Sequence, residues 1–173
     1  PASTDLWLRP AHVPSMQGTG TVEAICTAPK GGEPMEKHDT IEAVAGKGLR
    51  GDRYFDETGT YSNNAQVDDI PRDLTLFELE TLDHVAADYD IYLDVTDHRR
   101  NVTVSDVAVD HLLDERFRIG DVVCEGVRLC EPCSYLEQIT EDGVYDALVH
   151  RAGLNAAIVE SGEISVGDTV EPL

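Results

Sequence analysis

Three of the four cysteines of this chain lie within ten positions of one another, in the segment VVCEGVRLCEPCSYLEQ at residues 122–138. They are Cys124, Cys130 and Cys133, and the fourth, Cys26, lies far upstream. A cysteine thiolate is both a nucleophile and a ligand for soft metals. This segment is therefore the first candidate for a metal site, a redox disulfide or a single reactive thiol.

The C-x-x-C spacing of Cys130 and Cys133 leaves alternatives open. A structural zinc site needs four ligands, so Cys124, Cys26 or a histidine would have to complete the pair. The same spacing suits a redox dithiol, although the surrounding pattern is not the βαβ unit of a thioredoxin. All four thiols can also be simple packing residues, which is what we expect of Cys26 inside an alternating strand.

Local context favours Cys133 as the functional thiol. Residues 122–130 have the alternation of a strand, in which Cys124, Arg128 and Cys130 share one parity. Pro132 suits the first position of a helix formed by the following SYLEQI. Cys133 would then lie in the first helical turn, where backbone amides and the positive end of the helix dipole stabilise a thiolate.

The charge of the chain restricts its partners. The 34 acidic residues outnumber the 13 basic ones, which gives a formal net charge of −21, and lysine occurs only as Lys30, Lys37 and Lys47. Such a charge repels phosphate backbones and anionic headgroups, so neither nucleic acid nor a membrane surface is expected as a partner. Scarce lysine on an aspartate-rich surface predicts a halophilic source, where molar salt screens the self-repulsion.

The elements that position these residues are mostly strands. The length of 173 residues fits one domain. We see neither an apolar run that could span a membrane nor a signal peptide, so we expect a cytoplasmic protein. Frequent glycine turns between short strands favour a mainly β (α+β) protein, a closed or nearly closed β-barrel with a few short helices. We expect strands within 19–29, 74–76 and 100–104, helices at 77–89 and 107–112, two strands around the Gly-Asp turn at 120–121, and a C-terminal hairpin that turns at 161–162.

Four ordered motifs carry a resemblance to a known family. GLRGDRYF, RRNVTV, FRIGDVVCEGVRLCEPCSYLEQI and HRAGLNAAIVESGEISVGDTVEP resemble, in this order, the MOSC domain, which occurs at the C-terminus of molybdenum cofactor sulfurases and as free-standing proteins. The likeness divides the chain into an N-terminal extension at 1–17 and a MOSC domain at 18–173. It implies a barrel-like fold that binds a molybdopterin-type cofactor or passes sulfur to one, with Cys133 as the functional cysteine.

A pterin cofactor carries a phosphate and a dithiolene, so the resemblance implies a locally positive site. One guanidinium group can donate two parallel hydrogen bonds to the oxygens of a phosphate or to carbonyl oxygens. Gly48 and Gly51 would let the backbone approach the ligand. Asp52 can accept hydrogen bonds from the pterin ring or simply pair with its neighbour Arg53. The cofactor-binding candidates are Gly48, Arg50, Gly51, Asp52, Arg53, Arg99, Arg100, Asn101 and Arg151.

The histidines receive less weight as site residues. His38, His84, His98 and His111 lie in polar stretches of the sequence, so we expect their side chains to be solvated. Only His150 lies near the motifs.

The resemblance implies a stand-alone MOSC protein that holds molybdenum through Cys133 and reduces N-hydroxylated or related small substrates. A sulfur-carrier or cofactor-delivery module with a persulfide on Cys133 is the alternative, and a zinc-stabilised structural domain is the third hypothesis. We find no aminotransferase-like domain and no lysine in a setting for pyridoxal phosphate, so that cofactor is not expected in this chain alone. We also find no four-cysteine run for an iron–sulfur cluster, so a partner protein would supply electrons or sulfur.

Overall fold

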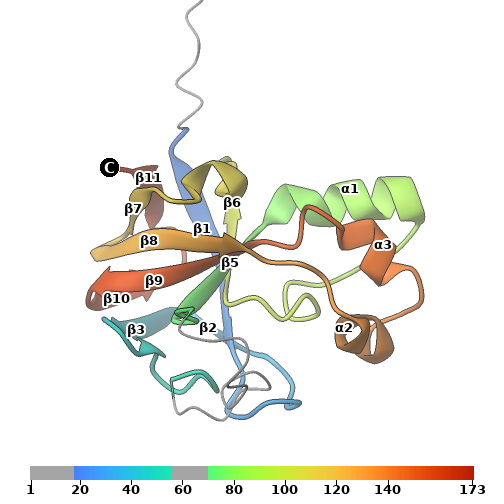
Figure 1. Cartoon of the computed structure of the whole chain (residues 1–173), viewed down its shortest axis with the longest axis horizontal. Helices are drawn as coiled ribbons and strands as arrows, with labels where there is room; N and C mark the ends of the chain where they lie inside the picture. The colour runs from blue at the N-terminus through green and yellow to red at the C-terminus, as the bar shows by residue number, and fades with distance from the viewer. Residues whose placement is uncertain (1–17, 56–69) are drawn as a thin grey trace, which may run out of the picture.

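The computed structural model describes residues 18–55 and 70–173, and the predicted N-terminal extension lies outside them. The described part contains short strands and helices in mixed order (Figure 1). The strands are β1 (Gly20–Thr27), β2 (Glu36–His38), β3 (Thr40–Val44), β4 (Gly48–Leu49), β5 (Leu74–Glu78), β6 (Val102–Ser105), β7 (Arg116–Ile119), β8 (Val122–Leu129), β9 (Leu154–Glu160), β10 (Gly162–Ser165) and β11 (Thr169–Pro172). The helices are α1 (Leu79–Tyr89), the 3₁₀ helix η2 (Val109–Leu112), α2 (Ser134–Ile139) and α3 (Val144–Leu148).

Seven of these strands close into a barrel within the described residues. They follow the order β11-β7-β8-β9-β5-β6-β1, and β1 returns to β11 through the pairs Gly20 with Val170 and Thr21 with Thr169. The neighbours are antiparallel except β5 and β6, which run parallel. The small strand β2 extends the sheet from β1, and β10, β3 and β4 form a separate three-stranded sheet. Closure leaves no free edge among the seven strands, and it confirms the predicted barrel.

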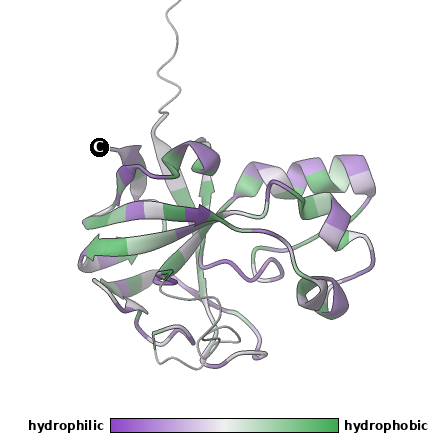
Figure 2. Cartoon of the chain, in the orientation of Figure 1, coloured by the Kyte–Doolittle hydropathy of each residue, from purple (hydrophilic) through white to green (hydrophobic). Residues whose placement is uncertain are grey.

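Two apolar clusters hold the barrel and the helices together. The larger fills the barrel with alternating residues from its strands, such as Val22, Leu76 and Phe117, which are fully buried. The smaller includes Phe77 and Val85, and it joins the three α-helices, which gather on one side of the barrel (Figure 1). The apolar strands and the mixed apolar and polar helix faces are visible in Figure 2. Full burial of one such large side chain stabilises the fold by about 1.5–3 kcal/mol.

The predicted C-terminal hairpin is wrong. β9 and β10 follow each other directly in the chain, but β9 pairs with β5 on one side and β8 on the other. Both edges of β9 are therefore occupied, and β10 pairs with β3 instead. The alternating pattern identified β9 correctly, but the single returning strand predicted after the turn is divided into β10 and β11. The partners of these strands depend on contacts far apart in the sequence.

Element boundaries also differ from the predictions. The strand expected to end at 76 continues to Glu78, so the predicted helix begins two residues late, at Leu79. The strand expected at 100–104 is β6, displaced to 102–105, and the helical segment expected at 107–112 is the short η2. Within the described residues, no helix has the length and apolar character that crossing a membrane requires.

Candidate functional site

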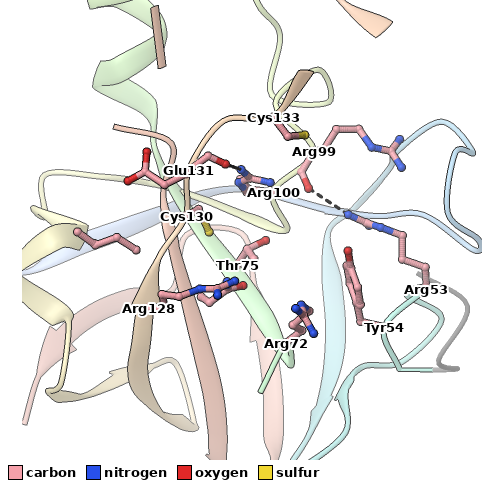
Figure 3. A pocket seen from close by; sticks show the side chains of 12 residues that line it. Arg53, Tyr54, Arg72, Thr75, Arg99, Arg100, Arg128, Cys130, Glu131 and Cys133 are labelled. Carbon is pink, nitrogen blue, oxygen red and sulfur yellow. Dashed lines mark hydrogen bonds between the residues drawn. The ribbon is translucent and has the colours of Figure 1, made fainter. Parts of the chain in front are cut away.

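A cavity of about 370 Å³ opens where the end of β8, the start of β5 and the segment before β6 meet (Figure 3). Its volume falls in the range of about 300–1,000 Å³ that is typical of small-molecule sites. Arginine is the most frequent residue on its wall, and sulfur is present as well. The lining residues are Arg53, Tyr54, Arg72, Thr75, Arg99, Arg100, Arg128, Leu129, Cys130, Glu131, Cys133 and Asn155.

The charge of this cavity is opposite to that of the molecule. Five of the lining residues are arginines and only one, Glu131, is acidic, although the whole chain carries −21. In the described part of the chain, Arg99, Arg100 and Arg128 form no salt bridge with a carboxylate. Converging guanidinium groups without carboxylate partners attract an anionic ligand with several oxygens. The charge of the cavity wall therefore suits an anion.

Cys133 is held at the rim of the cavity by the start of α2. Its extended backbone (φ −131°, ψ 158°) makes it the N-cap residue, and its carbonyl accepts hydrogen bonds from the backbone N–H groups of Leu136 (3.1 Å) and Glu137 (3.4 Å). The prediction that Cys133 lies inside the first helical turn is therefore wrong by one residue, because the helix starts at Ser134 rather than at Pro132. Cys133 is the one cysteine of the four that is not buried.

The other three cysteines are separated from one another in the fold. Cys124 lies in the barrel core, Cys26 packs with Ala28 and Met35, and Cys130 belongs to the cluster under the helices, against which Cys133 also packs. Burial raises the pKa of all three buried thiols, to about 12 for Cys124. Among residues 18–55 and 70–173, no group of three or more His, Cys, Asp or Glu side chains could hold a metal ion by itself. Cys26 is a packed thiol, as predicted.

Arg99 and Arg100 reach the cavity from a tight connection before β6. Arg99 has a left-handed backbone (φ 66°), so the two neighbouring side chains diverge. The Nε of Arg100 donates to the carbonyl of Ala152 (2.9 Å) and its Nη2 to the carbonyl of Glu131 (3.4 Å). The guanidinium of Arg99 donates to the carbonyl of Glu33. Burial and the neighbouring Arg53 lower the pKa of Arg99.

Asp52 supports Arg53 from beneath the cavity. Its carboxylate is fully buried and accepts hydrogen bonds from the backbone N–H of Ala28 (3.1 Å) and from Nη1 of Arg53 (3.1 Å). The Nη2 of Arg53 then donates to the carbonyl of Arg99 (3.2 Å). Asp52 is not part of the cavity wall, so of the two interpretations of this residue the pairing with Arg53 is the one seen.

Several predicted binding residues lie outside the cavity. Arg50 is exposed and pairs with Glu42, whereas Asn101 is buried and bonds Thr75 and the carbonyl of Cys26. Arg151 donates to the carbonyl of Ala147 (2.6 Å) on the helical side. Two glycines are explained by their backbone. Gly48 (φ 126°) has no room for a Cβ, which would lie 2.8 Å from the carbonyl oxygen of Asp73, and Gly51 (φ 88°) adopts a turn conformation.

Sequence reasoning missed Arg72 and Arg128 as cavity residues. Arg128 shares strand parity with Cys124, which is buried in the barrel. A β-bulge between Gly126 and Arg128 breaks that alternation, so Arg128 lines the cavity and Leu129 packs on the core. No local pattern signals the bulge, although a lone arginine in an apolar strand was a usable hint. Arg72 follows a polar stretch that offered no such hint.

His98 is fully buried, which contradicts the prediction of a solvated side chain. Its ring stacks on Phe77 with centroids 4.0 Å apart, and only 1% of the residue is exposed. Burial lowers its pKa to about 3, so the ring is neutral. His98 is therefore a packed core residue that directly precedes Arg99 and Arg100 in the chain.

The residues around the cavity fit a molybdopterin-type cofactor. A phosphate and the pterin oxygens need several hydrogen-bond donors, which Arg53, Arg99, Arg100 and Arg128 supply. Molybdenum prefers soft sulfur ligands, and Cys133 is a partly exposed thiol on the same wall. The fit rests on the chemistry of these side chains.

Fold and cavity together define a small β-barrel protein with an arginine-lined cavity next to a thiol. The sequence profile of the MOSC domain matches residues 63–171, more than half of the chain. The chain belongs to the MOSC domain family, as the ordered motifs predicted.

Solved structures with the same fold are distant in sequence. The YuaD protein from Bacillus subtilis has a TM-score of 0.72 at 16% identity, with 89% of this chain and 95% of that chain covered. YiiM from Escherichia coli has a TM-score of 0.63 at 13% identity, with 90% and 69% covered. YiiM from Geobacillus stearothermophilus has a TM-score of 0.62 at 13% identity, with 89% and 75% covered. No curated protein sequence matches the chain.

Proposed function

We propose that this protein binds a molybdenum cofactor of the molybdopterin type in the arginine-lined cavity and uses it to reduce N-hydroxylated or related small substrates. The observation that carries the proposal is that five arginines and one accessible thiol line the same cavity, although the protein as a whole has a net charge of −21. In this proposal Arg53, Arg99, Arg100 and Arg128 bind the oxygens of the cofactor, and the Cys133 thiolate is a metal ligand.

The reaction sets requirements on partners. Reduction of an N–OH group to N–H consumes two electrons and two protons and releases water. The cofactor, when bound, supplies the two-electron redox change. The electrons come from a reduced electron-transfer protein. Pyridoxal phosphate has no role in this scheme.

A sulfur-carrier function is the second candidate, and one observation favours it. Cys133 is the only accessible thiol, so a sulfur donor protein can reach it while the other three cysteines are protected by burial. In this case the Cys133 thiolate would take the outer sulfur of a donor protein's persulfide, and the donor would leave as its own thiolate. Delivery of that sulfur to the cofactor as sulfide would consume two electrons from a reduced electron-transfer protein, without turnover by this chain alone. The intact mass would then rise by about 32 Da on Cys133.

Elemental analysis separates the candidates. The protein is purified at high KCl from a host that makes the cofactor, together with Cys133→Ser and the matched control Cys124→Ser. Molybdenum near one equivalent in the wild type and in Cys124→Ser, with loss in Cys133→Ser, is the expected result. Full molybdenum in Cys133→Ser would refute the ligand role, and a persulfide without molybdenum would establish the sulfur carrier. Zinc in place of both would establish the structural-site hypothesis.

A further inference from the structure

A second cavity of about 280 Å³ lies next to the arginine-lined one, and the two share Arg99. Its wall comes from three separate parts of the chain: the connection between β1 and β2, the segment before β6, and helix α2. The volume lies just below the range of about 300–1,000 Å³ that is typical of ligand sites, so the cavity suits a small compound. None of the proposed cofactor contacts other than Arg99 lies on this wall.

The polar residues of this wall are Thr96, Asp97, Arg99, Tyr135 and Thr140. Arg99 supplies donors, Asp97 supplies an acceptor, and the hydroxyl of Tyr135 can act as either. Among the described residues the guanidinium of Arg99 donates only to the carbonyl of Glu33 and forms no salt bridge, so further N–H groups remain for a ligand. The hydroxyl of Tyr135 has no hydrogen bond to another described residue, and it lies near Gly32 across the cavity. Asp97 uses Oδ2 to accept the backbone N–H of Asp94 (2.7 Å), which leaves Oδ1 as an acceptor.

The remaining wall is apolar, and the charges balance. Pro34, Met35 and Ile139 provide a surface for a compact hydrocarbon body. Arg99 and Asp97 carry opposite charges, so the cavity is close to neutral, in contrast to the neighbouring arginine-lined cavity. The net charge of −21 repels anions at long range. A ligand that satisfies these groups is uncharged and carries an oxygen acceptor next to an N–H donor.

We propose that this second cavity is the substrate site, and that it binds uncharged planar compounds of the amide and N-hydroxyamide type. Their oxygen accepts hydrogen bonds from Arg99 and Tyr135, their N–H donates to Asp97, and their apolar body packs on Met35 and Ile139. Helix α2 joins the two sites, because Cys133 caps it on the wall of the first cavity and Tyr135 lies two residues further, on the wall of the second. In Figure 3 the Cys133 sulfur lies on the side of Arg99. The inference rests on the proposed function for the reaction and on the cavity alone for binding.

Binding is tested without any cofactor. The ¹⁵N-labelled protein is titrated with benzamide, and with benzoate as an anion of the same size, while backbone NMR signals of Thr96, Asp97 and Thr140 are followed. We expect saturable shifts at these residues with benzamide and at least tenfold weaker binding of benzoate. Shifts outside this cavity, no shifts, or stronger binding of benzoate would overturn the proposal.

Two variants and their controls locate the ligand. Ile139→Trp fills the cavity and should weaken benzamide binding at least tenfold, whereas Val149→Trp, an exposed apolar position that lines neither cavity, should leave it unchanged. Tyr135→Phe should weaken it about fivefold by loss of one hydrogen bond, with Tyr145→Phe on α3 as the control. Equal effects in variant and control would overturn the assignment.

Turnover separates this inference from the proposed function. With molybdenum-loaded protein, Ile139→Trp should raise KM for N-hydroxybenzamide at least tenfold and leave KM for hydroxylamine unchanged, because hydroxylamine has no body to place in the cavity. Unchanged KM for N-hydroxybenzamide would overturn the substrate site while the proposed function stood. Benzamide binding in the expected place without any reduction by the loaded wild type would refute the proposed function and leave the binding site supported.

Discussion

The backbone N–H of Arg100 donates a hydrogen bond to Nδ1 of His98 (3.0 Å), and this contact defines the state of the buried imidazole. Because Nδ1 is an acceptor, the ring proton is on Nε2, which donates to Oγ1 of Thr103 (3.0 Å). The ring thereby fixes the connection that contains Arg99 to the residue after it, Arg100, and to Thr103 on β6. The left-handed backbone of Arg99 directs the side chains of Arg99 and Arg100 to different sides. A core residue thus positions two side chains of the candidate site.

Replacement of His98 tests this positioning role. His98→Asn places an amide oxygen where Nδ1 accepts, so it should keep most of the phosphate affinity of the arginine-lined cavity, whereas His98→Leu should lose about tenfold. Both variants lose the stacked ring and should unfold at lower temperature. Calorimetric titration with inorganic phosphate and a parallel melting curve measure the two effects. Equal phosphate affinity in His98→Leu and the wild type would show that the ring is only a packing residue.

Acidification should weaken the fold through His98. Its pKa is about 3 in the folded chain, whereas an unfolded chain takes up a proton at its ordinary value of about 6.5. The unfolded state therefore binds more protons between these values, and stability falls with decreasing pH by up to about 1.4 kcal/mol per pH unit from this group. Urea unfolding at about pH 7 and pH 5 should show a smaller difference for His98→Asn than for the wild type. The same difference in both proteins would contradict the buried neutral ring.

The arginines of the cavity should bind a simple oxyanion despite the overall charge. Arg100→Gln should weaken inorganic phosphate about tenfold, since a hydrogen bond to a charged group contributes about 1.5–3 kcal/mol. Arg118→Gln is the matched control, because Arg118 is exposed on β7 and lines neither cavity. Titration at low salt is the measurement. A similar loss in both variants would show that only the net charge matters.

Alkylation should single out Cys133. Burial both shields Cys26, Cys124 and Cys130 and raises their pKa values, so their thiolates are scarce at neutral pH. Peptide mass mapping after brief iodoacetamide treatment should find the label at Cys133, with the other sites labelled at least tenfold more slowly. Equal labelling of Cys130 and Cys133 would indicate that the segment opens readily and would weaken the single-thiol assignment.

Salt should stabilise the protein. With 34 acidic and 13 basic residues, self-repulsion favours the expanded chain, and screening removes it. The melting temperature should rise by several degrees as KCl increases from about 0.1 to about 2 M, and NaCl should act similarly if screening is the cause. A melting temperature that stays flat or falls with salt would refute the halophilic hypothesis.

Local patterns were enough to predict the barrel and to single out Cys133 as a candidate. Period-2 alternation marks β1, β7 and β8, and turns between short strands indicate a closed sheet, because hydrophobic alternation and glycine conformations are properties of neighbouring residues. The burial of Cys26 follows from the same alternation. The ordered motifs added the family, and the family added the cofactor expectation.

Tertiary structure decided which charged residues share a site. Arg53, Arg72, Arg100 and Arg128 come from distant parts of the chain and meet only because the barrel closes and a bulge shifts the side-chain alternation of β8. It also placed Arg50 and Arg151 elsewhere, buried His98, and paired β10 with β3 rather than with its neighbour β9. Sequence spacing determines which face of a local element a side chain occupies, whereas the partner of that face is fixed by packing between segments that the sequence keeps apart.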